Sequence, residues 1–274
     1  MSGDLHCHTV KSDGSLEPCR VVDLAVKLSL PCVAITDHDT MDGVGSALSR
    51  AAETGVKVIP GLEVSSYDFL HGKKVHILCL LPKNPETLLE LCRQTLFDRT
   101  KASLEMAEKV GTRYPIDVET VKEYAANSTA VYKQHILCAL MDMGYSLSVF
   151  GELYSSLFSK SNGWALINAK LPDTREVLRL VKETGGAAIL AHPGVYGNFD
   201  IIEELCNMGL DGIEVWHPRQ SESDTARALE ASQSFNLIRT GGSDFHGMYA
   251  SRVTDLGAKQ TEDAELEKLL CRFG

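Results

Sequence analysis

The sequence has no long apolar segment and no leader-like start. Across its 274 residues, no apolar run approaches the ~20 residues that a membrane-spanning helix needs. The first residues, Met-Ser-Gly-Asp-Leu-His, contain neither a basic segment nor the apolar run of a signal peptide. We therefore expect a cytoplasmic protein without a membrane partner. Its hydrophobic fraction of 44% is sufficient for a globular core.

Cysteine pairs of the kind that bind zinc are also missing. None of the 8 cysteines forms a Cys-x-x-Cys pair. They are scattered through apolar segments, at positions 7, 19, 32, 79, 92, 138, 206 and 271. This distribution argues against a thiolate zinc site and against a disulfide framework, and it favours buried free thiols.

Basic residues are in the minority. The 27 Lys and Arg residues stand against 37 Asp and Glu residues, which gives a formal net charge of −10. Binding to long duplex DNA depends on neutralising phosphates, so this balance argues against such a partner. It does not argue against a small anionic substrate, because a cluster of divalent cations attracts phosphate locally whatever the total charge.

The start of the chain carries the first candidate site. His6 and His8 lie two residues apart, so on a β-strand both imidazoles point to one side, while Cys7 points to the other side, into packing. Asp13 follows in a Ser-Asp-Gly turn that can fold it back toward the strand end. Three such ligands are the beginning of a metal site. Taken alone, the histidine pair is equally compatible with two partly buried residues that cap a strand.

Strands and helices alternate in both halves of the chain. Apolar runs bounded by turn residues predict buried strands, and apolar residues at helical spacing predict helices between them. The predicted strands are residues 4–9, 32–36, 56–64, 74–81, 187–191, 212–216 and 237–242. The predicted helices are residues 21–30, 41–54, 174–183, 201–208, 221–235 and 263–271. This order is typical of an α/β fold with a parallel sheet.

Between the two halves the pattern changes. Residues 84–161 contain no convincing buried strand, and helical spacing predicts helices over residues 87–109, 118–127, 133–143 and 146–158. We therefore predict an α/β domain made of residues 1–82 and 165–274, with a small all-helical insert or lid over residues 83–164.

Imidazoles and carboxylates collect at the ends of the predicted strands. In a β/α barrel these ends open on one rim, where catalytic groups gather. Such a shell suits Zn, Mn or Fe(II), and a bridging carboxylate such as Glu63 would hold two ions about 4 Å apart. For His76, which lies inside an apolar strand, a core histidine is the alternative. The residues at or near these ends are His6, His8, Asp13, His38, Glu63, His76, His192, His217, Asp244 and His246.

These segments resemble the motifs of the PHP (polymerase and histidinol phosphatase) family. The matching residues are His6-x-His8, Asp13, Thr36-Asp37-His38-Asp39, Glu63, His76, Ala191-His192-Pro193 and Gly242-Ser243-Asp244-Phe245-His246-Gly247. The insert and residues 213–218 most resemble the branch of 3′,5′-nucleoside bisphosphate phosphatases. The resemblance implies an α/β fold of the distorted (β/α)7 barrel type that holds two or three divalent metal ions.

The ligand set that the resemblance implies can be placed on this chain. His6, His8, Glu63 and Asp244 would hold a first ion, and Glu63, His76 and His192 a second. Asp13, His38 and His246 would hold a third, while Asp37 and Asp39 would support His38. A metal-bound hydroxide would attack the phosphomonoester of a small nucleotide. His217 could supply the proton that the leaving oxygen needs.

The insert departs from that branch at residues expected to read phosphate. Lys133 stands where the relatives usually carry an arginine, two residues before His135, which is a second catalytic candidate. Val195 stands where they tend to have another arginine. A lysine still pairs with phosphate as a point charge, and Arg219 is a candidate to compensate. For His135, Lys133 and Arg219 the alternative is an ordinary surface role.

Three other functions stand beside phosphomonoester hydrolysis. A 5′–3′ exonuclease or phosphodiesterase on short single-stranded RNA or DNA would use the same metals, with bases stacking on aromatic residues of the insert. Metal-dependent hydrolysis of a carbon–nitrogen bond is compatible with a metal-bearing barrel of this kind. A non-catalytic nucleotide-binding module is the alternative of another class, and the complete ligand set argues against it. The sequence leaves the oligomeric state open.

Overall fold

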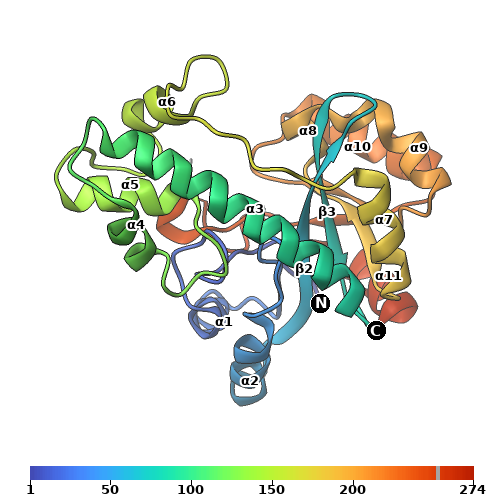
Figure 1. The fold of residues 1–274 in the computed structure, drawn as a ribbon. Helices are drawn as coiled ribbons and strands as arrows, with labels where there is room; N and C mark the ends of the chain where they lie inside the picture. Colours follow the sequence, from blue (N-terminus) through green and yellow to red (C-terminus); the bar gives the residue numbers. More distant parts are fainter. Residues whose placement is uncertain (251–253) are drawn as a thin grey trace.

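A curled sheet of six strands lies at the centre of the computed structural model, which describes residues 1–250 and 254–274 (Figure 1). Neighbouring strands follow chain order, from β1 to β6. The strands are β1 (Cys32–Ile35), β2 (Lys57–Asp68), β3 (Lys73–Leu80), β4 (Ala187–Leu190), β5 (Gly212–Trp216) and β6 (Ile238–Gly241). The α/β class and six of the predicted strands are confirmed.

The direction of β3 differs from the predicted parallel arrangement. Strand β1 pairs in parallel with β2, as do β4 with β5 and β5 with β6, whereas β3 runs antiparallel to both β2 and β4. The reason is local, because a tight turn at residues 69–72 joins β2 directly to β3. Gly72 adopts a φ of 68° in this turn, which a glycine does without strain. No crossover helix separates the two strands, so they must be antiparallel.

The predicted strand at residues 4–9 is an extended segment with isolated bridges, not a regular strand. Its Asp4 pairs with Val33 of β1. On its other side, the N–H of Leu5 donates to the carbonyl oxygen of Gly241 in β6 at 3.2 Å. The segment therefore lies between the two edge strands of the curled sheet. That it counts as the seventh strand of a barrel stays a prediction.

Helices cover the outside of the sheet. Helix α7 illustrates how the sequence specifies such a helix. Asp173 accepts a hydrogen bond from the N–H of Arg175 at the start of the helix, and Val177 and Val181 pack on the sheet. No helix among the described residues is long and apolar enough to cross a bilayer. The covering helices are α1 (Pro18–Lys27), α2 (Val44–Thr54), α7 (Thr174–Glu183), α8 (Pro193–Tyr196), α9 (Ile202–Asn207), α10 (Glu222–Ser234) and α11 (Asp263–Phe273), with short 3₁₀ turns at η1 (Asn198–Ile201) and η2 (Gly247–Tyr249).

Four further helices come from the middle of the chain. Helix α3 runs from the group formed by α4, α5 and α6 to the sheet near α7 (Figure 1). The group has an apolar core of its own, which includes Met106, Ile136 and Leu157. That residues 83–164 act as a separate lid domain stays a prediction. The helices are α3 (Glu86–Gly111), α4 (Val118–Tyr124), α5 (Lys133–Asp142) and α6 (Glu152–Phe158).

Inside the curled sheet, side chains change from apolar to polar along each strand. Because side chains alternate between the two faces, Ile59 and Glu63 share the inward face of β2, and Leu78 and His76 share that of β3. Ile59 and Leu78 are fully buried in an apolar cluster. Glu63 and His76 follow them toward one mouth of the sheet, which is where the candidate site lies.

Candidate metal centre

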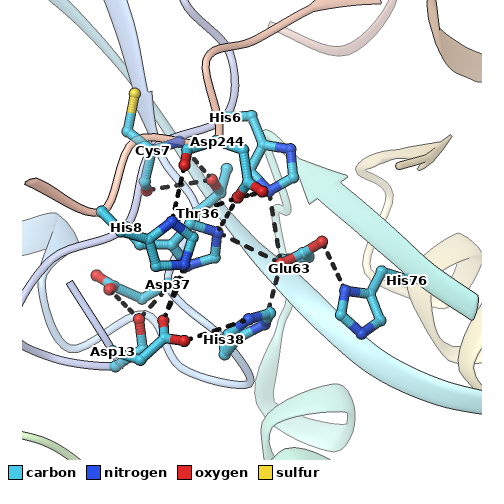
Figure 2. A network of polar contacts seen from close by, with 12 residues as sticks. His6, Cys7, His8, Asp13, Thr36, Asp37, His38, Glu63, His76 and Asp244 are labelled. Atoms are coloured by element: carbon cyan, nitrogen blue, oxygen red, sulfur yellow. Dashed lines mark hydrogen bonds and ion pairs between the residues drawn. The ribbon is translucent and has the colours of Figure 1, made fainter. Parts of the chain in front are cut away.

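The extended segment presents two histidines to this mouth. The N–H of His8 donates to the carbonyl oxygen of Phe245 at 2.8 Å, and the N–H of Thr36 donates to that of Cys7 at 2.9 Å. These bonds hold the segment on both sides. His6 and His8 point to the same side, and the Cys7 sulfur points away into the core beside α1 and α2 (Figure 2).

Glu63 is the shared neighbour of five imidazoles. Its Oε1 lies 2.8 Å from Nδ1 of His76 and 2.8 Å from Nε2 of His192. Its Oε2 lies 3.0 Å from Nδ1 of His38, and 3.4 Å from the Nε2 atoms of both His6 and His8 (Figure 2). A carboxylate that meets several imidazoles through both oxygens has the geometry that a bridge between two ions requires.

Two more carboxylates face the same imidazoles. Asp244 Oδ1 lies 3.2 Å from Nε2 of His8, and its Oδ2 lies 3.3 Å from Nε2 of His217. Asp13 Oδ1 lies 3.2 Å from Nε2 of His246. The turn at residues 12–14 therefore brings Asp13 back to the histidines, as its sequence suggested.

All nine predicted metal ligands meet in one cluster. Within each of four groups, the ligand atoms lie within 4.8 Å of one another. Neighbouring groups share a residue. The predicted division of the ligands into one set for each of three ions is therefore reproduced only in part. The groups are His8, Asp13, His38 and His246; His6, His8 and Asp244; His6, Glu63 and His192; and His38, Glu63 and His76.

Several buried polar atoms of the cluster lack a hydrogen bond within the described chain. They are Nε2 of His6, Nε2 of His8, Oδ1 of Asp13, Nδ1 of His38 and Nδ1 of His192. Buried polar atoms in folded proteins nearly always have a partner, so such a group indicates a missing ligand. Imidazole nitrogens with carboxylate oxygens suit Zn, Mn or Fe. The residues present therefore fit divalent metal ions, as the family resemblance implied.

The electrostatics of the cluster favour bound positive charge. Burial alone would lower the pKa of His8, yet the adjacent Asp244 and Glu63 raise it to about 10. Burial lowers the pKa of His76 to about 3, although Glu63 acts in the opposite direction. Burial would raise the pKa of Glu63, but the imidazoles around it hold that pKa well below its usual value. The ionised carboxylates therefore stabilise positive charge in the cluster, and a bound cation would supply that charge in place of the proton on His8.

Glu214 contacts two of the predicted ligands, His6 and His192. This role was not predicted from the sequence. Its carboxylate lies 3.0 Å from Nδ1 of His6 and accepts a hydrogen bond of 2.7 Å from the backbone N–H of His192. The side chain is fully buried in the middle of β5. A signal was present, since a glutamate inside the apolar run Gly-Ile-Glu-Val-Trp needs a partner in the interior.

Two buried aspartates fix the loops that carry ligands. Asp37 accepts hydrogen bonds from the N–H of Thr9 at 2.7 Å and from Oγ of Ser12 at 2.6 Å. Asp4 accepts a hydrogen bond of 2.9 Å from the N–H of Ser243. Asp37 was expected to support His38, but its carboxylate instead anchors the loop that precedes Asp13.

The backbone is strained where the ligands are held. His192, Asp244 and Asp39 have φ values of 27°, 51° and 57°, in the region that side chains other than glycine rarely adopt. Each such residue costs about 1–3 kcal/mol, and such residues gather at functional sites. Gly242 permits another close approach, because a Cβ there would lie 2.3 Å from the Cβ of His6.

The predicted proton donor His217 is fully enclosed beside Asp244. Its Nδ1 accepts a hydrogen bond of 3.1 Å from the backbone N–H of Arg219, and its Nε2 faces Asp244 at 3.3 Å. The Arg219 side chain is exposed. His217 therefore touches the cluster, whereas Arg219 lies at its rim.

The start of helix α5 contacts the cluster through Gln134 and carries the predicted residues Lys133 and His135. Gln134 donates to Asp13 Oδ2 at 2.9 Å. His135 is buried, so its surface alternative is wrong, and its Nδ1 accepts a hydrogen bond of 3.1 Å from the N–H of Tyr132. Burial lowers the pKa of His135 to about 4. Lys133 is half-buried, with Nζ 5.8 Å from the centre of the Phe158 ring.

Two curated relatives align along most of the chain. A phosphoribosyl 1,2-cyclic phosphate 1,2-diphosphodiesterase from Eggerthella lenta is 39% identical over 259 residues, which are 94% of this chain and 98% of that protein. A 3′,5′-nucleoside bisphosphate phosphatase from Chromobacterium violaceum is 28% identical over 253 residues, which are 89% of this chain and 86% of that protein.

A solved structure has the same fold. It comes from Bifidobacterium adolescentis and is described as a metal-dependent phosphoesterase. It superposes with a TM-score of 0.91 at 30% identity, over 98% of this chain and 96% of the other. The family profile of the PHP domain matches residues 4–200, which include seven of the nine clustered ligands. By its motifs, its cluster and this match, the chain belongs to the PHP domain family.

Proposed function

We propose that this protein hydrolyses a phosphate ester of a small phosphorylated ribose, with phosphoribosyl 1,2-cyclic phosphate as the first candidate substrate. The protein is a metal-dependent phosphoesterase of the PHP family. The observation that carries the proposal is the cluster around Glu63, where imidazoles and carboxylates converge and buried polar atoms lack hydrogen bonds. The cyclic ester comes first because the relative of that name is 39% identical along almost its whole length.

A 3′,5′-nucleoside bisphosphate, the substrate class that the sequence suggested, is the second candidate. The relative from Chromobacterium violaceum supports it at 28% identity. Lys133 and Val195 stand where arginines were expected, which weakens the match to that branch. Exonuclease action on short single strands and a non-catalytic nucleotide-binding role are tested by the same assay.

The protein's part in the chemistry is to fix the ligands of two or three divalent ions. When bound, such ions activate water and stabilise negative charge on phosphoryl oxygens. Glu214 aims His6, and Asp37 fixes the loop before Asp13, so the ligands are held before an ion arrives. The residues that would hold the ions are His6, His8, Asp13, His38, Glu63, His76, His192, Asp244 and His246.

We propose that His135 donates a hydrogen bond to the substrate. Because its Nδ1 accepts the N–H of Tyr132, the proton of the neutral ring sits on Nε2. The lowered pKa of about 4 keeps the ring neutral at physiological pH. A neutral Nε2–H is suited to a phosphoryl oxygen and does not add a positive charge beside the ions.

His217 is better placed to position Asp244 than to protonate a leaving group. Its Nδ1 is occupied by the N–H of Arg219, so the ring carries its proton on Nε2, toward Asp244. Because Nε2–H faces a carboxylate and the side chain is enclosed, the geometry supports a positioning role. Proton donation by His217 stays a prediction.

The helices of residues 83–164 are proposed to cover the mouth of the cluster as a lid. Their support is the contact of α5 with the site, through Gln134 and Asp13 and through the Tyr132 hydroxyl, which donates to the carbonyl oxygen of His38 at 3.4 Å. The (β/α)7 description is likewise supported by the extended segment between β1 and β6.

The test is a product assay across defined esters with Mn²⁺, Zn²⁺ or Fe²⁺ supplied. We expect turnover of phosphoribosyl 1,2-cyclic phosphate above that of adenosine 3′,5′-bisphosphate and of a labelled single-stranded oligonucleotide. Glu63→Gln is the control, and it should lose turnover by at least about 10³-fold, since ions supply several kcal/mol. No turnover of any phosphate ester with metals loaded would contradict the proposal, and preferred digestion of the oligonucleotide would replace it with the exonuclease function.

A further inference from the structure

The loop that carries Asp13 is fastened to the helical insert through its backbone. Oγ of Ser128 donates to the carbonyl oxygen of Ser12 at 2.6 Å. The N–H and the hydroxyl of Thr129 both donate to the carbonyl oxygen of Lys11, at 3.0 and 2.8 Å. Ser128 and Thr129 lie just before α5, so these bonds fix the start of that helix against the loop.

Gln134 extends this attachment to the carboxylate of Asp13. Gln134 is buried, and its Nε2 donates to Asp13 Oδ2 at 2.9 Å. The other oxygen, Oδ1, is buried without a hydrogen bond in the described chain and lies 3.2 Å from Nε2 of His246. The amide therefore occupies one carboxylate oxygen and turns the other toward the imidazoles. A carboxylate held in this way is oriented before an ion binds.

The insert contacts one ligand group in particular. Among the described residues, Asp13 occurs in only one of the four candidate groups. The insert also contacts His38 of this group, because the Tyr132 hydroxyl donates to its carbonyl oxygen at 3.4 Å. A change at Gln134 should therefore act on the ion of this group and leave the groups around Glu63 in place. The group consists of His8, Asp13, His38 and His246.

We propose that Gln134 positions Asp13 for a divalent ion, and that this hydrogen bond links ion binding to docking of the insert on the sheet. This inference rests on the proposed function, because that function requires the ions. The coupling is reciprocal. Gln134 reaches Asp13 only while α5 is docked, so the factor that its hydrogen bond adds to ion affinity must also be added to docking when the ion is bound. Loss of such a contact to a ligand costs about 10–100-fold in metal affinity.

The first test measures ion affinity. Gln134→Met removes the donor and keeps the length of the buried side chain. Equilibrium dialysis with Mn²⁺ should show that one ion binds about tenfold more weakly in this variant and that the affinities for the others change by less than about twofold. Gln94→Met is the matched control, because Gln94 also donates to an aspartate, Asp98, but at an exposed position of α3. It should match the wild type. Equal affinities in Gln134→Met and the wild type would overturn the inference.

A double variant assigns the affected ion. Among the described residues, His246 occurs in the same candidate group as Asp13 and in no other. His246→Asn should therefore remove the ion that Gln134→Met weakens. When the two substitutions are combined, Gln134→Met should change no remaining affinity by more than about twofold, because two changes at one site are not additive. An effect of Gln134→Met that is as large in the His246→Asn protein as in the wild type would overturn the inference.

The second test measures docking by hydrogen exchange of the α5 amides. Mn²⁺ should slow this exchange in the wild type, and in Gln134→Met the slowing should be smaller by the same factor that separates the two ion affinities, about tenfold. Ser128→Ala loosens the loop without touching Asp13, so it should speed exchange about fivefold and keep the response to Mn²⁺. Faster exchange in Gln134→Met with an unchanged response to Mn²⁺ would mean a purely structural role and would overturn the inference. Gln134→Asn, whose amide is one methylene short of Asp13, replaces Gln134→Met if that variant does not fold.

Dialysis and exchange keep this inference distinct from the proposed function, because neither measurement needs a substrate. If Mn²⁺ binds and no ester is hydrolysed, the proposed function fails while both measurements still test Gln134. If esters are hydrolysed and Gln134→Met binds Mn²⁺ as the wild type does, only the role of Gln134 fails. A protein that binds no divalent ion would overturn both.

Discussion

The carboxylate of Glu214 lies 3.0 Å from Nδ1 of His6, and both side chains are fully buried. A ligating imidazole is oriented by the partner of its other nitrogen. Glu214 therefore turns Nε2 of His6, an atom without a hydrogen-bond partner in the described chain, toward Glu63. Strand β5 shapes the metal centre in this way without supplying a ligand of its own.

Glu214→Gln is expected to weaken metal binding while the protein stays folded. The amide keeps the shape of the side chain but removes the charge that orients His6, and such losses cost about 10–100-fold in metal affinity. Titration against a chelating dye measures the affinity, and activity should return when metal is added in excess. Glu230→Gln, at an exposed position of α10, is the control. An unchanged affinity in Glu214→Gln would rule out this orienting role.

Removal of the ions is expected to lower thermal stability. Ligands that bind only the folded state stabilise it, by about 2.7 kcal/mol at a hundredfold excess over Kd. For a chain of this size that corresponds to a fall in Tm of about 5 °C or more after chelation. Scanning calorimetry with and without a chelator measures the shift, and added Mn²⁺ or Zn²⁺ should reverse it. A Tm that chelation leaves unchanged would show that the unpaired nitrogens are not ligands.

His135→Asn is expected to lower kcat by about 10²-fold, the usual effect of losing one donor to a developing negative charge. The asparagine can still accept the N–H of Tyr132, so α5 should keep its start. The pKa of about 4 means that His135 is already neutral above pH 5. The ratio of wild-type to variant rates should therefore be constant from pH 6 to pH 9. A ratio that changes with pH in this range would show that His135 titrates during turnover and transfers a proton.

Glu265 gives a pH-dependent prediction away from the metals. Burial would raise its pKa, but hydrogen bonds from Lys268 and Arg239 lower it below the ordinary glutamate value. The resulting stability is fully present above the unfolded pKa of about 4.3 and is lost as the pH falls through the lower folded value. Glu265→Gln should thus cost about 1–3 kcal/mol at pH 7 and less near pH 3.

Urea unfolding at both pH values measures this difference. Glu267→Gln, at an exposed position two residues further along the same helix, is the control and should match the wild type. A loss that is equally large at pH 7 and pH 3 would show that packing of the side chain, rather than its charge, ties α11 to β6.

The residues of the cluster could be predicted from the sequence because several follow recognisable local patterns and the whole set resembles the motifs of one family. The spacing of His6 and His8 fixes a shared face whether or not the segment is a regular strand. Asp13 lies close to the histidines because Ser12 and Gly14 on either side of it favour a turn. The antiparallel direction of β3 was not predicted, because an apolar run indicates a buried strand but not the direction in which it pairs. Gly72 in the short connection between β2 and β3 was nevertheless a signal for a hairpin.

Residues that act through contacts between distant elements could not be placed in the same way. Arg99 lies on the long helix α3, where a charged residue at helical spacing looks like part of a solvated face. Only the crossing of α3 over the sheet brings it to Ser65 and Asp39.

The extended segment at residues 4–9 has a consequence for the order in which the site can assemble. Its backbone forms hydrogen bonds with β1 and with Gly241. Nε2 of its His8 lies 3.2 Å from Oδ1 of Asp244, which follows β6. His6 and His8 precede their partners Asp244 and His246 by more than 230 residues along the chain. The groups that contain Asp244 or His246 therefore need parts of the chain from both sides of the sheet, whereas His38, Glu63 and His76 come from neighbouring strands and their loops.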